Sequence, residues 1–485
     1  MITAEKIAVI DIGSNSCRMV IYERAGGALI PYFNEKTMAG LGRDLSETGR
    51  LSPAGKELAL KTFHRFRAIT TSLNISDVRA VATAAVREAV DGDEFQRTAE
   101  TILGVPIKVL TGADEGRLSA LGVKIGFFKP KGIVADLGGT SMELRSLGDD
   151  SPGETFLLGP LARAKDAELT LEKRVKAMRK ILSGSDLATE FSGNKLFAVG
   201  GAWRNVAAVH MMLLNYPLRV AHGYSMSRSD IRNVIEAADL AASDKLTREQ
   251  LQGVSKRRFD TLLHAALLLD TLMEHLGTEK AVISSYGLRD GVAAEELDTD
   301  GASGLLEAVP LFLRSSKQTI LFGHELYNFI SPIAQQLKQN DHVLRAICMM
   351  ADAGARMHPD HRANLVYEQV LRAPVPGLSH AQRLFAAYAA ASRYTFKFFE
   401  QPEYAGLLKL SMKRRAKILG CAMRLASVYS GRSGDILATS SLRLDKGALC
   451  MHVARKNSDL ISETVERRLS QLSGLLKLHP RLIVE

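Results

Sequence analysis

Two stretches of the sequence match each other at a constant offset: Val9-Ile10-Asp11-Ile12-Gly13-Ser14-Asn15-Ser16 and Val134-Ala135-Asp136-Leu137-Gly138-Gly139-Thr140-Ser141. The offset is 125 positions, which is 136 − 11 for the two aspartates. Each copy is an apolar run followed by Asp, a turn of Gly and small polar residues, and a second apolar run. Because internal repetition is a strong architectural signal, the repeat predicts two related lobes that face one another with phosphate between their turns.

The residue types of the two turns suit phosphate. Gly allows φ > 0 and close approach of the backbone, so successive N–H groups can point into one concavity. Short side chains add hydrogen-bond donors: Ser14, Asn15, Ser16, Thr140 and Ser141. Asp11 and Asp136 end their strands and could hold Mg²⁺, which prefers carboxylate, water and phosphate oxygens. One copy alone would also suit an ordinary β-hairpin, whereas two copies in matched register favour phosphate.

The composition bounds the class of protein. At 485 residues the chain is long enough for two to four domains, and its apolar fraction of 46% is typical of a globular protein. It contains no apolar run of membrane-spanning length, no signal-peptide pattern and no CxxC pair among its four cysteines. We therefore expect a cytoplasmic protein without a membrane span, a disulfide framework or a zinc site.

The excess positive charge lies in the last third of the chain. Residues 301–485 hold 25 Lys and Arg against 14 Asp and Glu, a net charge of +11, whereas residues 1–300 hold 38 against 39. A basic module beside a phosphate cleft predicts a polyanionic substrate or partner. Its densest cluster contains Lys413, Arg414 and Arg415, which would also suit a solvated helix face or a nucleic-acid patch. We expect no nucleic acid as a partner.

The order of apolar runs and helical periodicity predicts a duplicated α/β fold. Residues 1–126 would form lobe I, which opens with a three-strand meander, and residues 127–300 would form lobe II, which repeats that meander. Residues 301–485 change to a mostly helical pattern after a Gly/Ser linker. A hairpin signal at Asp445-Lys446-Gly447 and a closing helix predict a small α+β module from about residue 435.

Three charged residues near the two turns are candidates for chemistry. Glu115 lies in the first turn of a predicted helix, where acids are common because they complement the helix dipole; as a functional group it would be a general base for water. Arg87 would either clamp a phosphate through its fork of donors or be a surface arginine. Glu143 follows the second turn as Arg18 follows the first, and it would face a metal or be a strand-surface charge.

A third glycine turn, Gly200-Gly201, follows another predicted strand. It would contact an adenosine in a nucleotide-binding protein, or begin a tight helix in a protein that binds only phosphate. Trp203 is expected to pack at this turn rather than to stack on a base.

The motifs, in this order, resemble the exopolyphosphatase / guanosine pentaphosphatase family over residues 6–295. The resemblance rests on Asp-Ile-Gly-Ser-Asn-Ser with Arg18, Leu41-Gly42 with Thr48-Gly49, Ala82-Thr83-x-Ala85 with Arg87, Asp136-x-Gly-Gly-Thr-Ser-x-Glu143, His222-Gly223-Tyr224, and Gly287-Leu288-Arg289-Asp290-Gly291. Relatives usually have three glycines in the second turn, and Thr140 replaces the third here.

The resemblance implies a pair of actin-like ATPase (ribonuclease H-like) lobes and Mg²⁺ as the cofactor. It implies Glu115 as the catalytic residue, Asp136 and Glu143 as the metal-associated acids, and Gly13–Ser16 and Gly138–Ser141 as the phosphate loops. The activity that it implies is processive release of terminal phosphate from inorganic polyphosphate. Alternatives are a guanosine pentaphosphate (pppGpp) phosphohydrolase, with Arg18 and Arg258 against the guanine, an ATP-driven kinase or chaperone, and a silent alarmone sensor.

The helical part resembles the family's third domain, which is related to the HD phosphohydrolases. Ala351 stands before Asp352, where the His of the His-Asp pair would be. We therefore expect a noncatalytic domain that guides a polyanion and carries a homodimer interface.

Overall fold

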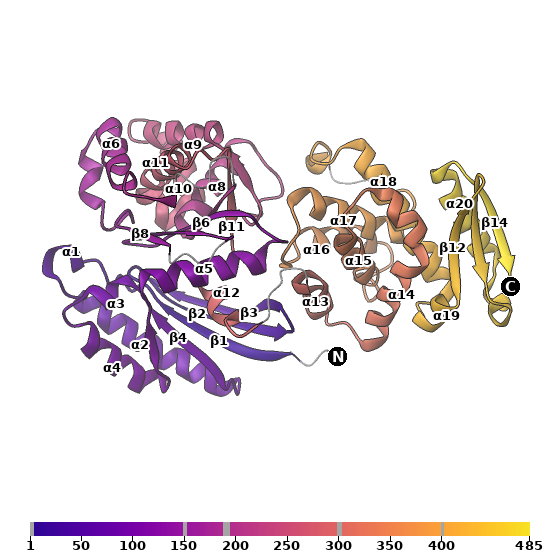
Figure 1. The fold of residues 1–485 in the computed structure, drawn as a ribbon, viewed down its shortest axis with the longest axis horizontal. Helices are drawn as coiled ribbons and strands as arrows, with labels where there is room; N and C mark the ends of the chain where they lie inside the picture. Colours follow the sequence, from indigo (N-terminus) through magenta and orange to yellow (C-terminus); the bar gives the residue numbers. More distant parts are fainter. Residues whose placement is uncertain (1–3, 149–152, 188–194, 298–302, 399–401) are drawn as a thin grey trace. The chain divides into compact units, whose positions relative to one another are not determined.

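The computed structural model describes residues 4–148, 153–187, 195–297, 303–398 and 402–485 (Figure 1). The chain forms two compact units, residues 5–301 and residues 302–485, hereafter the two-lobe unit and the C-terminal unit. The expected linker at Gly301 begins outside the described residues.

Lobe I is built on a five-stranded sheet in the order β3-β2-β1-β4-β5. Its strands are β1 Glu5–Ile12, β2 Cys17–Ala25, β3 Ala28–Thr37, β4 Asp77–Ala82 and β5 Ile107–Val109. Its helices are α1 Leu45–Thr48, α2 Pro53–Ser72, α3 Ala84–Glu88, α4 Gly92–Leu103 and α5 Gly112–Gly126. The first three strands are antiparallel, as the expected meander requires, and β4 and β5 add to β1 in parallel.

Lobe II repeats this arrangement in the order β8-β7-β6-β9-β11, with β10 added at the edge. Its strands are β6 Gly132–Leu137, β7 Met142–Ser146, β8 Glu154–Phe156, β9 Lys195–Val199, β10 Ser225–Ser227 and β11 Lys280–Ser284. Its helices are α6 Leu171–Leu182, α8 Gly201–Leu213, α9 Arg228–Leu240, α10 Lys245–Ser255 and α11 Phe259–His275. The two sheets share this strand order, in agreement with the repeat in the sequence.

The strand registers of the two copies also agree. Asp11 pairs with Arg18 across β1 and β2, and Asp136 pairs with Glu143 across β6 and β7. The two aspartates therefore occupy equivalent positions in their sheets. Their strand partners, Arg18 and Glu143, are also equivalent, as the offset of 125 positions predicts. The strand ends of both lobes consequently carry charged side chains at equivalent places.

Two helices cross between the lobes. Helix α5 follows the last strand of lobe I and packs on β6, β7 and β8 of lobe II, whereas α12 (Leu288–Ala294) follows β11 of lobe II and packs on β1 and β3 of lobe I. In Figure 1 both helices lie between the two sheets. The sequence did not predict α12, because a seven-residue helix that begins at a Gly-Leu pair has too little periodicity to detect.

Hydrophobic cores lie on both faces of the lobe I sheet. Ala8, Ile10 and Ile12 face the α2 and α4 side of lobe I, while Ile7 and Val9 face α5 and α12. Because β1 is buried on both faces, its sequence is a continuous apolar run rather than an alternating one. A separate core of lobe II surrounds the fully buried Trp203 side chain.

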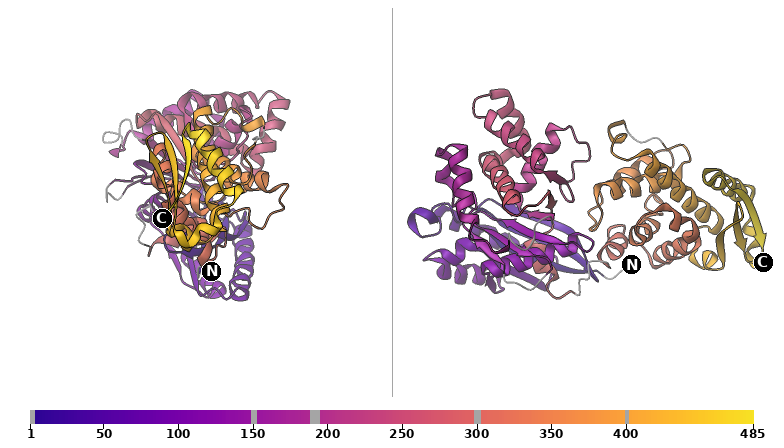
Figure 2. Two further views of the ribbon diagram at one scale, coloured as in Figure 1. Left: turned by 90° about the vertical axis from the view of Figure 1, so that its right-hand side faces the viewer. Right: turned by 45° about the horizontal axis from the view of Figure 1, so that its top comes forward.

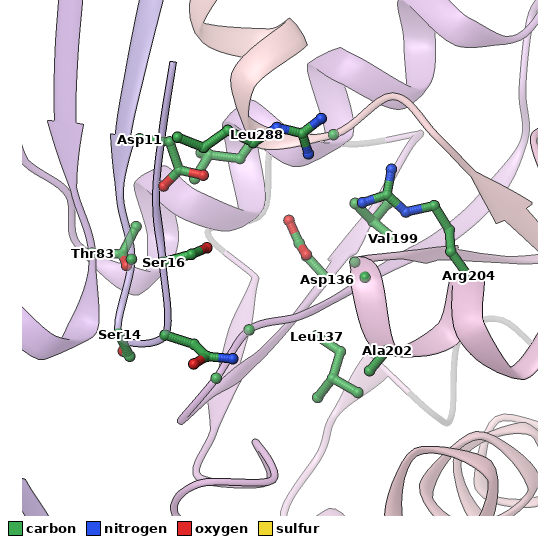
Figure 3. A pocket seen from close by; sticks show the side chains of 18 of the residues that line it. Asp11, Ser14, Ser16, Thr83, Asp136, Leu137, Val199, Ala202, Arg204 and Leu288 are labelled. Atoms are coloured by element: carbon green, nitrogen blue, oxygen red, sulfur yellow. The ribbon is translucent and has the colours of Figure 1, made fainter. Parts of the chain in front are cut away.

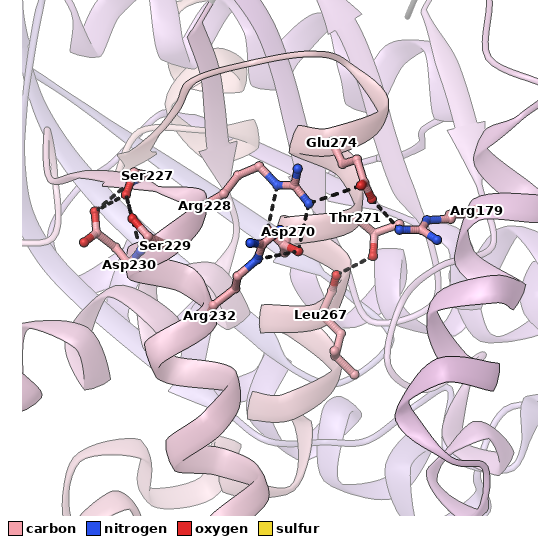
Figure 4. A network of polar contacts seen from close by, with 10 residues as sticks. All are labelled: Arg179, Ser227, Arg228, Ser229, Asp230, Arg232, Leu267, Asp270, Thr271 and Glu274. Atoms are coloured by element: carbon pink, nitrogen blue, oxygen red, sulfur yellow. Dashed lines mark hydrogen bonds and ion pairs between the residues drawn. The ribbon is translucent and has the colours of Figure 1, made fainter.

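An ionic network joins three helices of lobe II (Figure 4). Arg228 at the start of α9 donates to Asp270 of α11 at 2.8 Å, and Arg179 of α6 donates to Glu274 of α11 at 2.7 Å. Ser227 forms a capping box with Asp230 at the start of α9. These contacts are partly exposed and join α6, α9 and α11 to one another.

The C-terminal unit is mostly helical, as its sequence predicts, and ends in a three-stranded sheet of which the sequence predicts two strands (Figures 1 and 2). Its helices are α13 Ser303–Phe312, α14 Lys317–Ala334, α15 Asp341–Met349, α16 Arg362–Leu371, α17 His380–Tyr394, α18 Leu410–Ser430, α19 Gly434–Ala438 and α20 Glu463–Leu476. The predicted hairpin is β12 Ser440–Asp445 with β13 Ala448–Val453, and β14 His479–Val484, which was not predicted, pairs in parallel with β13. Among the described residues, no helix combines the length and apolarity needed to cross a bilayer.

We predict that Gly291→Ala destabilises the two-lobe unit. A Cβ atom at Gly291 would meet the Leu118 carbonyl of α5, and backbone on both sides leaves little room to adjust. The expected loss is about 1–3 kcal/mol of unfolding free energy, read as a lower denaturation midpoint by calorimetry. Gly253→Ala in α10 is the matched control, because a Cβ there meets nothing within 4 Å. Equal midpoints for the two variants would contradict the close packing of α5 on α12.

Candidate active site

A cavity of about 220 Å³ lies between the two lobes, inside the two-lobe unit. Both glycine turns line it, through Gly13, Ser14, Asn15 and Ser16 of lobe I and Gly138 and Gly139 of lobe II. Figure 3 shows Asp11 on one side of the cavity, Asp136 near its middle and Arg204 on the opposite side. The two predicted turns therefore open onto one space.

The turns have the same internal hydrogen bond and meet at their tips. The Gly13 N–H donates to the Ser16 carbonyl at 3.1 Å, and the Gly138 N–H donates to the Ser141 carbonyl at 2.9 Å. A Cβ atom at Gly139 would lie 3.3 Å from the Ser14 Cβ atom in the opposite lobe. Glycine at position 139 therefore allows the lobes to close on one another at this point.

Glu115 reaches the cavity because the start of α5 is fixed. The Thr111 side chain accepts from the Asp114 N–H at 3.1 Å, and Asp114 accepts from the Thr111 N–H at 3.2 Å. This capping box sets the first turn of the helix. Glycine at position 112 leaves room for Thr155 of β8, so the helix start packs directly against lobe II.

The environment of Glu115 tunes its acidity. Burial raises the pKa of Glu115 to about 7, against the opposing effect of the Arg87 guanidinium, and the nearby charges of Asp136 and Asp11 add to the increase. A carboxylate with a pKa near neutral pH is well matched to general-base chemistry. The group thus has both the position and the basicity to take a proton from water.

Arg87 lies behind Glu115 and is absent from the cavity lining. Its Nη1 atom donates to the Glu115 carboxylate at 2.7 Å and to the Leu110 carbonyl at 2.5 Å. The sequence offered a phosphate clamp or a surface arginine, whereas the structure places the guanidinium on the candidate base. A pairing between residues 28 positions apart leaves no local pattern in the sequence.

The other three carboxylates differ in their partners. Asp11 accepts from Arg289 at 2.6 Å, and Asp136 accepts from the Ser119 hydroxyl of α5. Burial raises the pKa of Asp136. Burial also raises the pKa of Glu143 well above its usual range, and the negative charge of Glu115 adds to this shift.

The arrangement of the acidic side chains is partly suited to binding a hard cation such as Mg²⁺. Among the described residues, no group of three or more His, Cys, Asp or Glu side chains forms a metal cage. The Oε1 atom of Glu143 is nevertheless buried with no hydrogen-bond partner in the described chain, and Asp136 stands one strand away. Mg²⁺ usually takes one or two carboxylates and completes its shell with waters and phosphate oxygens, so this donor set is compatible with it.

Five cationic side chains also line the cavity: Arg18, Lys36, Arg204, Arg258 and Arg289. Sequence reasoning had named two of these, Arg18 and Arg258, and missed the other three as site residues. Arg289 belongs to a motif already noted, and Lys36 stands opposite Arg18 in the β2–β3 register, so a hairpin count could have found it. Arg204 comes from α8 and carried no local signal.

Burial and neighbouring positive charges lower the pKa of four of these cations and so make them stronger acids. The pKa of the fifth, Arg289, is raised, because the effect of burial is exceeded by that of Asp11 and other nearby groups. Burial, with the positive charge of Arg289 nearby, lowers the pKa of Arg18 and of Arg204 to about 10 in each case. Burial also lowers the pKa of Arg258. Like charges held together at partial burial are stabilised by a bound polyanion, which makes this end of the cavity a receptor for several phosphate groups.

The third glycine turn is covered by one of these cations. A Cβ atom at Gly201 would collide with the guanidinium of Arg258, so this side chain lies directly on the turn. Trp203 packs in the core and donates from Nε1 to the Ala265 carbonyl at 3.0 Å, as expected. Gly201 begins α8, which agrees with the alternative of a tight helix start.

The remaining sequence candidates lie outside the cavity lining. Thr140 and Ser141 are buried behind the second turn, and the hydroxyl of Thr140 has no partner in the described chain. The cluster Lys413, Arg414 and Arg415 belongs to α18 of the C-terminal unit. In that unit Asp352 pairs with Arg393 at 2.7 Å, so an arginine offsets its charge where an HD site would use metal.

Comparison with known proteins gives a family match in each of the two units. The Ppx/GppA phosphatase family matches residues 20–300, more than half of the chain. A second family described as "Exopolyphosphatase, C-terminal" matches residues 330–483.

Three curated relatives differ in how much of this chain they match. Exopolyphosphatase 1 of Mycobacterium tuberculosis is 24% identical over 316 residues, which are 62% of this chain and 92% of that protein. Exopolyphosphatase 1 of Mycobacterium leprae is 26% identical over 310 residues, 61% of this chain and 90% of that protein. Guanosine-5'-triphosphate,3'-diphosphate pyrophosphatase of Aeromonas hydrophila is 24% identical over 470 residues, 92% of this chain and 91% of that protein.

Solved structures share the fold of the larger unit. The Aquifex aeolicus Ppx/GppA enzyme has a TM-score of 0.52 at 23% identity and covers 61% of this chain and 100% of its own. An exopolyphosphatase from Cytophaga hutchinsonii has a TM-score of 0.53 at 21% identity and covers 61% of this chain and 98% of its own. With its paired glycine turns, its buried acid and the match over residues 20–300, this chain belongs to the Ppx/GppA phosphatase family.

Proposed function

We propose that this chain is a phosphoanhydride hydrolase that releases terminal phosphate from inorganic polyphosphate. The observation that carries the proposal is one cavity in which Glu115, with its pKa raised to about 7, faces two glycine turns and five cations. Phosphoryl transfer needs mainly positioning of the phosphates and stabilisation of their charge. The names of the relatives, exopolyphosphatase and pyrophosphatase of a guanosine polyphosphate, describe the same bond type.

In the proposed step a water molecule lies between Glu115 and the terminal phosphorus. Glu115 takes a proton from the water as its oxygen attacks phosphorus. The bond from phosphorus to the bridging oxygen breaks, and the shortened chain leaves with the electron pair. The N–H groups of the two turns hold the non-bridging oxygens, while the five cations bind the phosphates further along the chain.

Mg²⁺ remains part of the proposal. Asp136 and Glu143 would hold it, because the buried Oε1 atom of Glu143 has no partner among the described residues. When bound, it would supply positive charge to the phosphoryl oxygens. Asp11 is already ion-paired with Arg289 at 2.6 Å, so we place it in a supporting role.

A second candidate substrate is pppGpp. The alignment with the Aeromonas hydrophila pyrophosphatase spans 92% of this chain, so it includes both units. The cations distant from Glu115 would accept its additional phosphates, and Arg18 and Arg258 would face the guanine. An ATP-driven kinase or chaperone is less consistent with the cavity, because Arg258 lies on the turn that an adenosine would contact. The retained Glu115 argues against a silent sensor.

The finer expectations from the sequence stay predictions. The shared sheet order of the lobes supports the actin-like assignment. The homodimer and the HD-like origin of the C-terminal unit rest on the family resemblance, and the cytoplasmic location rests on the composition of the sequence.

We predict phosphate release from long-chain polyphosphate and from pppGpp, assayed side by side with and without Mg²⁺. Glu115→Gln should lower turnover by about 10²–10⁴-fold and leave binding of tripolyphosphate intact, because the amide cannot take the proton. Calorimetric titration measures the binding. Glu88→Gln, which alters the other carboxylate near Arg87 at 3.5 Å, is the control and should keep normal turnover. Full activity of Glu115→Gln would remove Glu115 from the role of base.

The pH dependence of kcat/KM should report the ionisation of Glu115 and the effect of Arg87 on it. The base acts when deprotonated, so the rate rises as pH passes the Glu115 pKa of about 7. In Arg87→Gln the burial effect is unopposed and the pKa rises further, which should move this limb to higher pH by about 1 unit. Arg87→Lys keeps the charge and should move it less. An unchanged limb together with a raised KM would instead assign Arg87 to phosphate binding.

The C-terminal unit is proposed to guide long chains. The proposal is supported by relatives that match only about 61–62% of this chain while being covered over 92–100% of their own length. Removing residues 302–485 should therefore raise KM more for long polyphosphate than for tripolyphosphate. Replacing Lys413, Arg414 and Arg415 together by Gln should give a smaller change in the same direction. Equal changes for the long and the short substrate would refute guidance.

A further inference from the structure

Lys36 occupies an unusual place at the mouth of the cavity. It lies near the end of β3, is exposed, and lines the cavity together with the two glycine turns. Its register partner on β2 is Arg18, a second cation. The adjacent Glu35 is already paired with Arg65 at 2.6 Å. Within the described chain, the Lys36 ammonium has no hydrogen bond and no ion pair.

The surroundings of Lys36 are positive on both sides of the cleft. Arg18 comes from lobe I, Arg204 and Arg258 come from lobe II, and Arg289 comes from α12. Although much of Lys36 is exposed, its side chain lines the cavity. Desolvation there, followed by the charges of these four residues, lowers the pKa of Lys36 to about 8. A lysine with a depressed pKa exposes a neutral, nucleophilic amine near neutral pH.

We propose that Lys36 is a site of covalent acylation by small acyl phosphates. The inference rests on the proposed function in one respect, namely that the cavity binds phosphate groups. The phosphate of an acyl phosphate would bind the cations and glycine turns as a substrate phosphate does. Its carbonyl group would then lie beside an accessible amine at the rim of the same cavity.

The chemistry balances without a further co-reactant. The lone pair of Lys36 Nζ attacks the acyl carbon and forms a C–N bond. The bond from that carbon to the phosphate oxygen breaks, and inorganic phosphate leaves with the electron pair. The amine loses a proton to solvent, and the product is a neutral amide. The surrounding arginines favour the step because they stabilise the departing phosphate.

Acylation would change the affinity of the cavity for substrate. The amide has no positive charge, so the cavity would retain four of its five cations. Long polyanions would bind more weakly, while Glu115 and both glycine turns stay unchanged. A metabolite with a reactive phosphate could in this way lower polyphosphate hydrolysis.

The experiment treats the full-length protein with acetyl phosphate at pH 7.5 and measures acetylation of each lysine over time by peptide mass spectrometry. At this pH a lysine with a pKa of about 8 is roughly one-quarter neutral, against about one-thousandth for a lysine of ordinary pKa. Because a weaker base is also a weaker nucleophile, we expect Lys36 to react about tenfold faster than Lys61. Lys61 is exposed on α2 and serves as the control.

Two comparisons identify the cause of the selectivity. Saturating tripolyphosphate should suppress acetylation of Lys36 and leave Lys61 unaffected. Arg204→Gln should slow the reaction at Lys36, because one of the cations that lower its pKa is removed. Acetic anhydride, which has no phosphate, should show less preference for Lys36 than acetyl phosphate does.

Acetylation of Lys36 at the rate of Lys61, or labelling that tripolyphosphate does not suppress, would overturn the proposal. The readout needs no turnover, so it is separable from the proposed function. The Glu115→Gln variant should be acetylated at Lys36 as fast as the unaltered protein. If the protein hydrolysed polyphosphate normally but Lys36 showed no selectivity, only the acylation proposal would fail.

Discussion

Helix α5 is buried between the two sheets, and the geometry of the cavity depends on this constraint. Leu118 and Ile125 pack toward the sheet of lobe I, while Ala120 and Val123 pack toward the sheet of lobe II. Glycines at positions 122 and 291 let α5 and α12 touch through their backbones. A helix confined on all sides cannot rotate without breaking both cores. Its first turn therefore presents Glu115 in one orientation relative to both glycine turns.

The same helix contributes to the electrostatics of the site. Ser119, one turn after Glu115, donates its hydroxyl proton to Asp136, and Gly116 leaves room for the Cβ atom of Glu143 at 3.7 Å. Three carboxylates from two lobes are thus held close together at partial or full burial. Desolvation and mutual repulsion raise the pKa values of Glu115, Asp136 and Glu143 alike. Arg87 opposes this effect at Glu115 through a hydrogen bond and its charge, and at Glu143 through its charge only.

Side chains of both charges line the cavity. Asp11, Asp136, Glu143 and Glu115 come from β1, β6, β7 and α5, whereas Lys36, Arg204 and Arg258 come from β3, α8 and the segment before α11. A chain of phosphates crossing this space would meet the hydrogen-bond donors of the turns, the candidate base and several cationic side chains. A lining rich in cations suits a polyanion, whereas a nucleoside pocket usually has more apolar walls. These cations also contribute to the lowered pKa of Lys36, after the effect of burial.

The amino-acid sequence by itself determined the duplication, because a strand, an aspartate and a glycine turn are local features that repeat at a fixed spacing. It also placed Glu115 at a helix start and predicted the helical C-terminal unit and its hairpin. The partners of these residues were decided only by tertiary structure. Arg87 meets Glu115, and Arg289 meets Asp11 across 278 positions, because crossing helices bring distant segments together. The local spacing of residues cannot predict such contacts, because they depend on how the two sheets pack against the helices buried between them.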